Sequence, residues 1–151
     1  MILPPDRPLL DLQGRALVVP VNRVGVMGAG VALAVAERWP KARAHYRKVL
    51  GYNGLQIGTT ATFETRDGPM IFVPTKVHWR DPSQLEWVDM GLAALAQTLT
   101  ASPALGAQGV HLPALGCGRG GLAWHDVKVL IDRHLAALPV NVHRYAPETP
   151  A

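Results

Sequence analysis

A glycine-rich segment, residues 22–33 with the sequence NRVGVMGAGVAL, follows an apolar run and opens a segment typical of a helix. Glycine lets backbone N–H groups approach a ligand closely, and a helix N-terminus adds partial positive charge. The segment therefore suits a phosphate group. Its glycines, Gly25, Gly28 and Gly30, follow neither the dinucleotide fingerprint nor the P-loop pattern. A purely structural turn is the alternative.

A second glycine-rich segment, Gly116-Cys-Gly-Arg-Gly-Gly121, follows the apolar run 110–115. In α/β sheets, ligands bind beyond the carboxyl ends of the strands. Two such segments at one edge could hold the two ends of an extended ligand, and a diphosphate between two sugars fits better than a lone anion. The alternative is chance, because the chain has 15 glycines and loops are their usual place.

Polar side chains follow two of the strand-like segments. Asn22 offers a donor and an acceptor for sugar hydroxyls, or it caps the turn. Lys76 could hold phosphate, protonate a leaving group or attack an electrophilic carbon, or it is an exposed loop lysine. His78, Trp79 and Arg80 come directly after it. An arginine beside an aromatic ring suits stacking and phosphate contact, and a packed tryptophan between solvated neighbours is the alternative.

The other reactive side chains do not form a recognisable site. Cys117, the single cysteine, is expected to be a small buried residue rather than a nucleophile, and it excludes an internal disulfide. Four histidines lack the spacing of a metal site and are expected at the surface or at helix ends: His111, His125, His134 and His143.

Length and composition predict one packed domain. The chain has 151 residues, of which 48% are hydrophobic and 17% are charged. The net charge of +4 favours anionic partners, but the basic residues are scattered. The sequence contains neither an apolar run of membrane-spanning length nor a signal peptide at its start, so we expect no membrane association and a cytoplasmic location.

Strands alternating with helices predict an α/β fold with a mixed, centrally parallel sheet. Pro8 restricts the first strand to an edge, Asp67-Gly68 marks a hairpin, and Ser83 with Glu86 predicts a capping box at a helix start. Strands are expected at residues 9–12, 16–21, 59–65, 70–75, 110–115 and 140–145. Helices are expected at residues 28–39, 41–50, from about 84 to 102 and 124–138, with a tail at 146–151.

Three blocks of the sequence resemble a known family. They are residues 21–33, 74–80 and 112–124, with Trp39-Pro40 and Tyr46 adding to the first. Together they resemble the macrodomain, a three-layer α/β/α fold that binds ADP-ribose, in the variant found in DarG antitoxins and in the terminal ADP-ribose protein glycohydrolase. The resemblance implies a single macrodomain over residues 1–151.

The resemblance also implies a ligand and its contacts. ADP-ribose would lie along the two glycine-rich segments, with Asn22 near the distal ribose and Lys76 as the lysine on which catalysis depends. No metal or cofactor would be needed. The residues implied to bind ADP-ribose are Val21, Gly25, Val26, Met27, Gly28, Gly30, Val31, Pro113, Gly116, Cys117, Gly118, Arg119, Gly120 and Gly121.

DarG-type macrodomains remove ADP-ribose from thymine bases of DNA, and the resemblance implies that activity here. His78, Trp79 and Arg80 would contact ADP-ribosylated single-stranded DNA. The resemblance also implies a DNA ADP-ribosyltransferase toxin as a partner and a role in reversing DNA damage.

Two alternatives are a hydrolase of ADP-ribose linked to glutamate or aspartate of proteins, and a module that binds ADP-ribose without catalysis. Gly120 stands where the protein glycohydrolase carries an aspartate, which argues against the first alternative. Val19 and Pro8 also depart from the family pattern. Pro8 stands where the family carries a polar side chain that can contact the adenine, and proline has no such polar group. Lys76 argues against a module without catalysis.

Overall fold

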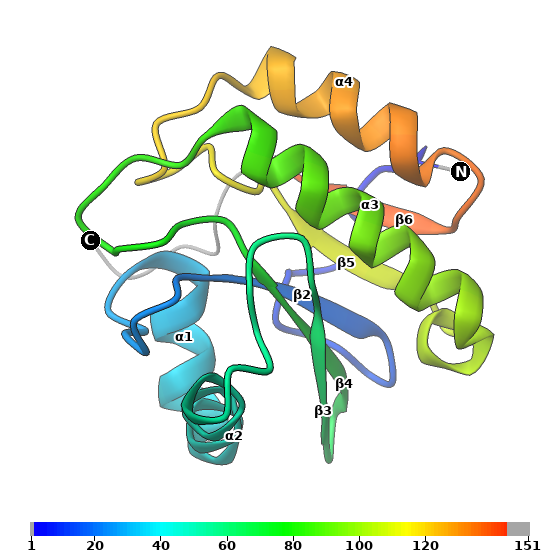
Figure 1. The fold of residues 1–151 in the computed structure, drawn as a ribbon. Coiled ribbons are helices and arrows are strands. Elements are labelled where there is room, and N and C mark those ends of the chain that lie inside the picture. Colours follow the sequence, from blue (N-terminus) through cyan, green and yellow to red (C-terminus); the bar gives the residue numbers. More distant parts are fainter. Residues whose placement is uncertain (1, 145–151) are drawn as a thin grey trace.

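A mixed sheet crosses the centre of the molecule, between two layers of helices (Figure 1). The computed structural model describes residues 2–144. The six strands lie in the order β1-β6-β5-β2-β4-β3, and neighbours are parallel except β3, which is antiparallel to β4. Their bounds are β1 Ile2–Leu3, β2 Ala16–Val21, β3 Ala61–Thr65, β4 Gly68–Pro74, β5 Val110–Pro113 and β6 Val140–His143.

Helices α1 (Gly30–Arg38) and α2 (Pro40–Gly51) cover one face of the sheet, and α3 (Leu85–Ala101) and α4 (Trp124–Leu135) cover the other (Figure 1). A short 3-10 helix spans Pro103–Gly106. Side chains along β2 alternate between the two apolar cores, because successive residues of a strand point to opposite faces. The predicted three-layer α/β/α arrangement and centrally parallel sheet are confirmed.

The register of the sheet brings the polar segments to one edge. Val21 pairs with Pro74, so the chain leaves β2 and β4 side by side. The amide of Thr75 donates to the carbonyl of Val21 at 2.9 Å, and the amide of Arg23 donates to the carbonyl of Val77 at 3.0 Å. Strand β5 lies on the other side of β2 and runs parallel to it. Both glycine-rich segments and the Lys76 segment therefore start from neighbouring strand ends.

The predicted edge strand at residues 9–12 is wrong. The first strand is β1, which pairs with β6. The amide of Asp11 donates to the carbonyl of Pro8, and the amide of Arg15 donates to the carbonyl of Leu12. The backbone therefore forms turns here. Leucines three residues apart reach the same side of such turns, and Leu9 and Leu12 are buried in the core beside α1 and α2.

The predicted capping box at Ser83 is also wrong. Helix α3 begins at Leu85 after Gln84, and no side chain caps it. The Ser83 amide donates instead to the carbonyl of Gly120 at 2.9 Å, which draws Ser83 toward the second glycine-rich segment. Other elements end within a few residues of the predicted positions. Tyr145 and the expected tail 146–151 lie outside the described residues.

Two histidines expected at the surface or at helix ends are buried side by side. His111 on β5 and His143 on β6 lie on the same face of the sheet, with ring centroids 4.7 Å apart. Burial lowers the pKa of His111. Burial, together with the neighbouring His111, lowers the pKa of His143 to about 4. The other two follow the expectation: His125 is exposed at the start of α4, and His134 lies in its last turn.

Candidate active site

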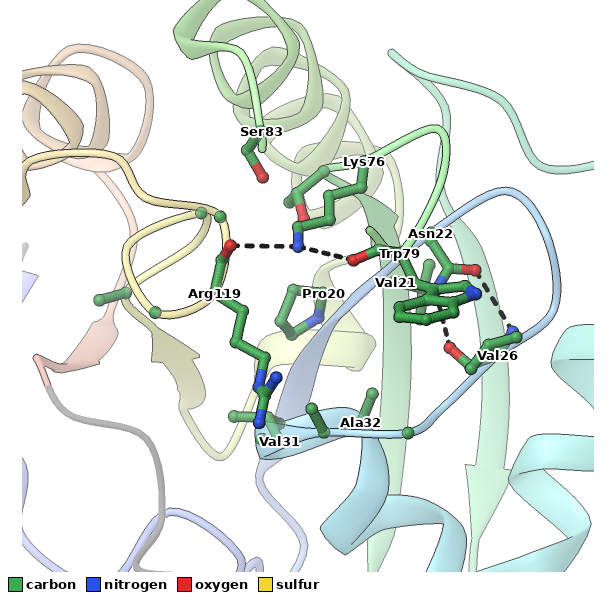
Figure 2. Close-up of a pocket in the computed structure, with 18 residues that line it drawn as sticks. Pro20, Val21, Asn22, Val26, Val31, Ala32, Lys76, Trp79, Ser83 and Arg119 are labelled. Carbon is green, nitrogen blue, oxygen red and sulfur yellow. Dashed lines mark hydrogen bonds between the residues drawn. The ribbon is translucent and has the colours of Figure 1, made fainter. Parts of the chain in front are cut away.

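A pocket of about 410 Å³ lies at the edge where the strands end (Figure 2). Three segments line it: the first glycine-rich segment with the start of α1, the segment after β4, and the second glycine-rich segment. The lining residues are Pro20, Val21, Asn22, Val26, Gly28, Ala29, Gly30, Val31, Ala32, Thr75, Lys76, Trp79, Ser83, Ala114, Gly116, Gly118, Arg119 and Gly120.

Most of the predicted site residues line this pocket, and some do not. The predicted residues outside its lining are Gly25, Met27, Pro113, Cys117, Gly121, His78 and Arg80. Met27 and Pro113 are buried, and Cys117 packs against the core under α3 and α4. Burial raises the pKa of the Cys117 thiol, which agrees with the expectation that it is no nucleophile.

Asn22 holds the first glycine-rich segment in shape. Its side-chain oxygen accepts hydrogen bonds from the amides of Val24, Gly25 and Val26 at 3.0, 3.1 and 3.3 Å. Its Nδ2 donates to the carbonyl of Val26 at 2.7 Å (Figure 2). The turn-capping interpretation of Asn22 is therefore confirmed. One Nδ2 hydrogen is left for a ligand, and contact with a ribose stays a prediction.

The hydroxyl of Tyr46, on helix α2, also forms hydrogen bonds with this turn. This hydroxyl lies 2.7 Å from the carbonyl oxygen of Asn22 and 2.8 Å from its Oδ1, and it accepts from the amide of Gly25 at 3.2 Å. Burial raises the pKa of Tyr46 to about 12, so the hydroxyl keeps its proton at neutral pH. The turn is fixed to the helical layer as well as to the sheet.

The start of helix α1 offers open donors for an anion. The amides of Val24, Gly25 and Val26 are occupied by Asn22, whereas no acceptor within residues 2–144 binds the amides of Gly30, Val31 and Ala32. Ala29, which precedes the helix, provides no side-chain cap. An open helix N-terminus binds phosphate through such amides. The start of helix α1 therefore suits a phosphate group, and phosphate binding there stays a prediction.

Lys76 joins two sides of the pocket. Its Nζ donates to the carbonyl of Trp79 at 3.1 Å and to the carbonyl of Arg119 at 3.2 Å (Figure 2). Both acceptors are backbone atoms, so the amine is positioned by the chain itself. An ammonium group has three hydrogens to donate. With two of them bound, one is left for a substrate atom.

The second glycine-rich segment turns sharply back on itself. Gly116 and Gly121 have φ of +75° and +76°, values that glycine adopts without strain. The amide of Leu122 donates to the carbonyl of Gly116 at 2.9 Å. A Cβ at Gly120 would lie 2.3 Å from the carbonyl oxygen of Gly116, so a side chain does not fit there. This segment needs glycine for space as well as for conformation.

Trp79 stands at the border of the pocket with 47% of its surface exposed. The guanidinium of Arg80 lies 5.0 Å from the centroid of its ring system, and the His78 ring lies 5.5 Å from it. The three side chains form an aromatic and basic row beside Lys76, in which Trp79 and Arg80 are exposed. Such a row can stack on a base and contact a phosphate, and DNA contact by it stays a prediction.

Sequence reasoning missed several residues of the site. Thr75 and Ala114 come directly after β4 and β5, so their place at the strand ends was a usable signal. The role of Tyr46 was not readable, because its partner lies 24 residues away in the chain. The further pocket residues missed are Pro20, Ala29, Ala32 and Ser83.

Metal-binding and membrane-spanning features are absent from the described part of the chain. His, Cys, Asp and Glu side chains within residues 2–144 do not gather in threes where an ion could be held. None of the helices there combines the length and the apolarity that crossing a bilayer takes. The expectation that no cofactor is needed stays a prediction.

The chain is similar to proteins of known family. The model of the family described as Macro domain matches residues 18–131. A DNA ADP-ribosyl glycohydrolase of Thermus aquaticus is 40% identical over 146 residues, which cover 92% of this chain and 39% of the relative. The chain thus spans about two fifths of the length of the curated DNA ADP-ribosyl glycohydrolases to which it is similar.

Solved structures agree with this. The macrodomain of Mycobacterium tuberculosis DarG matches with a TM-score of 0.83 and 35% identity, over 98% of this chain and 99% of that one. Thermosipho africanus DarTG in complex with ADP-ribose matches with a TM-score of 0.79 and 28% identity, over 86% of this chain and 38% of that one. The fold, the matched residues and these likenesses agree: the chain belongs to the macro domain family.

Proposed function

We propose that this chain hydrolyses the bond between ADP-ribose and a thymine base of DNA. The observation that carries the proposal is the position of Lys76, whose Nζ is fixed between the carbonyls of Trp79 and Arg119 in a pocket that also contains an open helix N-terminus. The similarity to DNA ADP-ribosyl glycohydrolases and to a structure with bound ADP-ribose supports it.

The diphosphate would bind to backbone amides. Those of Gly30, Val31 and Ala32 offer one set of donors, and the second glycine-rich segment offers another across the pocket. An extended ligand bound along both segments presents its terminal ribose toward Asn22 and Lys76. The pocket volume of about 410 Å³ lies within the usual range for ligands of moderate size.

In the reaction, the bond from the anomeric carbon to the base nitrogen breaks and its electron pair leaves with the base. Lys76 uses the hydrogen not bound to a carbonyl to protonate or hydrogen bond the departing base. Water adds to the anomeric carbon and loses a proton. If Lys76 instead attacked that carbon, a covalent adduct would form, and treatment with borohydride during turnover would trap its ring-opened imine on the protein.

The substrate is single-stranded DNA that carries ADP-ribose on a base. Trp79 stacks on a neighbouring base at the border of the pocket, and Arg80 contacts the phosphate backbone. Such a substrate must come from an enzyme that transfers ADP-ribose to DNA. A DNA ADP-ribosyltransferase toxin is therefore the functional partner.

The test compares two conjugates. Purified protein is incubated with an oligonucleotide that carries ADP-ribose on thymine and with a peptide that carries it on glutamate, and released ADP-ribose is measured by chromatography. The proposal expects release from the oligonucleotide at a rate at least tenfold above that from the peptide. Release from the peptide alone would favour a protein-linked substrate. Tight binding of ADP-ribose without release from either conjugate would favour a binding module.

A further inference from the structure

Ser83 carries a buried hydroxyl group that has no partner. The residue is only 4% exposed, and its Oγ makes no hydrogen bond within the described residues. The same residue lines the pocket that holds Lys76. A buried hydroxyl without a partner is unfavourable, because it has lost its hydrogen bonds to water and gained none in return. A ligand in the pocket is one source of the missing partner.

The Ser83 hydroxyl is also held in a fixed place. The amide of Ser83 donates to the carbonyl of Gly120 at 2.9 Å, so the backbone is tied to the second glycine-rich segment. A Cβ at Gly120 would lie 2.6 Å from Ser83 Oγ, which shows how closely the segment packs against the hydroxyl. Figure 2 shows the hydroxyl pointing to the side of the pocket where the Lys76 amine lies.

The position of Ser83 before helix α3 suggests a structural role, and the contacts do not support one. Helix α3 has no side-chain cap, and its preceding residue is Gln84. The hydroxyl therefore contributes no hydrogen bond to the folded protein that its removal would break. The unpaired hydroxyl of Ser83 lowers the stability of the fold and points into the pocket (Figure 2). Binding of a ligand therefore explains this serine better than a structural role does.

We propose that Ser83 contacts the substrate, with its hydroxyl hydrogen bonded to a hydroxyl group of the terminal ribose. The proposal rests on the function proposed above, which places that ribose next to Lys76. A serine hydroxyl both donates and accepts, as a sugar hydroxyl does. Ser83 would fix the sugar while the bond at its anomeric carbon breaks, from the side of the pocket opposite the first glycine-rich segment.

Two ligands that differ only in the terminal ribose test this contact. ADP-ribose has that sugar and ADP lacks it. Calorimetry measures the binding of both to the wild type, to Ser83→Ala and to Ser102→Ala, which changes the other serine of the chain, an exposed one. We expect Ser83→Ala to weaken ADP-ribose binding by about tenfold, the effect of losing one good hydrogen bond. Binding of ADP to Ser83→Ala, and of both ligands to Ser102→Ala, is expected to match the wild type.

Stability and turnover complete the test. Ser83→Ala is expected to melt at the wild-type temperature or above it, because no internal hydrogen bond is lost. Ser83→Cys, which keeps a side chain of similar size with weaker hydrogen bonding, is expected to show a similar loss of ADP-ribose affinity. With the ADP-ribosylated oligonucleotide, kcat/KM of Ser83→Ala is expected to fall by about tenfold or more.

The outcomes separate the two proposals. Equal loss of affinity for ADP and ADP-ribose, unchanged affinity for both, or a clearly lower melting temperature of Ser83→Ala would overturn the Ser83 contact. A wild type that releases no ADP-ribose from the oligonucleotide would overturn the proposed hydrolase activity instead. In that case the difference between ADP-ribose and ADP still decides whether Ser83 binds the sugar.

Discussion

The hydroxyl of Tyr46 lies 2.8 Å from the side-chain oxygen of Asn22, and that oxygen caps three consecutive amides of the first glycine-rich segment. A residue on helix α2 thus helps to set the conformation of a turn that follows strand β2. Helix α1 begins at Gly30, four residues after Val26, so the same contact helps to orient its open amides.

Removal of the Tyr46 hydroxyl therefore affects both stability and binding. Tyr46→Phe keeps the packing of the ring against Phe72, whose centroid is 5.8 Å away, but loses the hydrogen bonds to Asn22. We expect the free energy of unfolding to fall by about 1–2 kcal/mol and ADP-ribose to bind more weakly. Denaturant titration and calorimetry measure both. Tyr52→Phe, at a tyrosine that is 65% exposed, is the control, and an equal effect there would contradict the role of Tyr46.

Two glycines of the second segment differ in the space around them. A Cβ at Gly120 would lie 2.3 Å from the carbonyl oxygen of Gly116, whereas a Cβ at Gly118 meets no atom within 4 Å. Gly120→Ala must therefore displace the backbone that also binds Lys76 through the neighbouring Arg119. We expect it to lower kcat/KM by at least tenfold, and Gly118→Ala to have a much smaller effect. Similar losses in both variants would show that the clash is relieved without consequence.

The aromatic row beside the pocket predicts a contribution to DNA binding. Trp79→Ala removes the exposed ring but keeps the carbonyl that accepts from Lys76. Stacking of one base on an aromatic ring contributes about 1–3 kcal/mol, so KM for the oligonucleotide is expected to rise by tenfold or more, with a smaller change in binding of free ADP-ribose.

A matched control is Arg66→Ala at an exposed side chain of the turn between β3 and β4. Steady-state kinetics on oligonucleotides of several lengths measure the effect of Trp79→Ala. A KM that does not change would place the DNA strand elsewhere.

The buried pair of His111 and His143 predicts a loss of stability in acid. Burial lowers the pKa of His143 to about 4 and also lowers that of His111, whereas an unfolded histidine titrates near 6.5. Between these values the unfolded chain binds more protons than the folded one, so the free energy of unfolding falls as the pH is lowered from about 6.5 toward 4.

Melting temperatures measured across this range check the effect. In His143→Leu the dependence on pH is expected to become shallower. The Nε2 of His143 has no hydrogen-bond partner, so this substitution breaks no bond to that atom. A wild-type curve that is flat between pH 6.5 and 4 would contradict the role of the pair.

The fold was predictable where the pattern of apolar residues is local. The run Ala16–Val21 and the helix after Pro40 follow from apolar spacing and from proline at a helix start, and both are observed. The strand predicted at residues 9–12 is a buried turn instead, because the leucines of this short segment fit either structure equally well. No local pattern in the sequence distinguishes a strand from a buried turn at these positions.

The site was predictable in its position and less so in its contacts. Glycines and polar residues after strand ends indicated the edge of the sheet where the pocket lies, since parallel strands bring their carboxyl ends together. The sequence could not show that Asn22 takes the amides of its own turn and leaves those of Gly30 to Ala32 open. Nor could it show that Ser83 faces Gly120 rather than helix α3, because that contact joins residues far apart in the sequence.

The most direct measurement of the proposed function is release of ADP-ribose from an ADP-ribosylated single-stranded oligonucleotide by the wild type, Lys76→Ala and Lys128→Ala. Lys128 is an exposed lysine of α4 that pairs with Asp132 and is not among the residues that line the pocket. The proposal predicts loss of at least a hundredfold in kcat for Lys76→Ala, continued binding of ADP-ribose by that variant, and wild-type turnover for Lys128→Ala. Turnover by Lys76→Ala at the wild-type rate would contradict it.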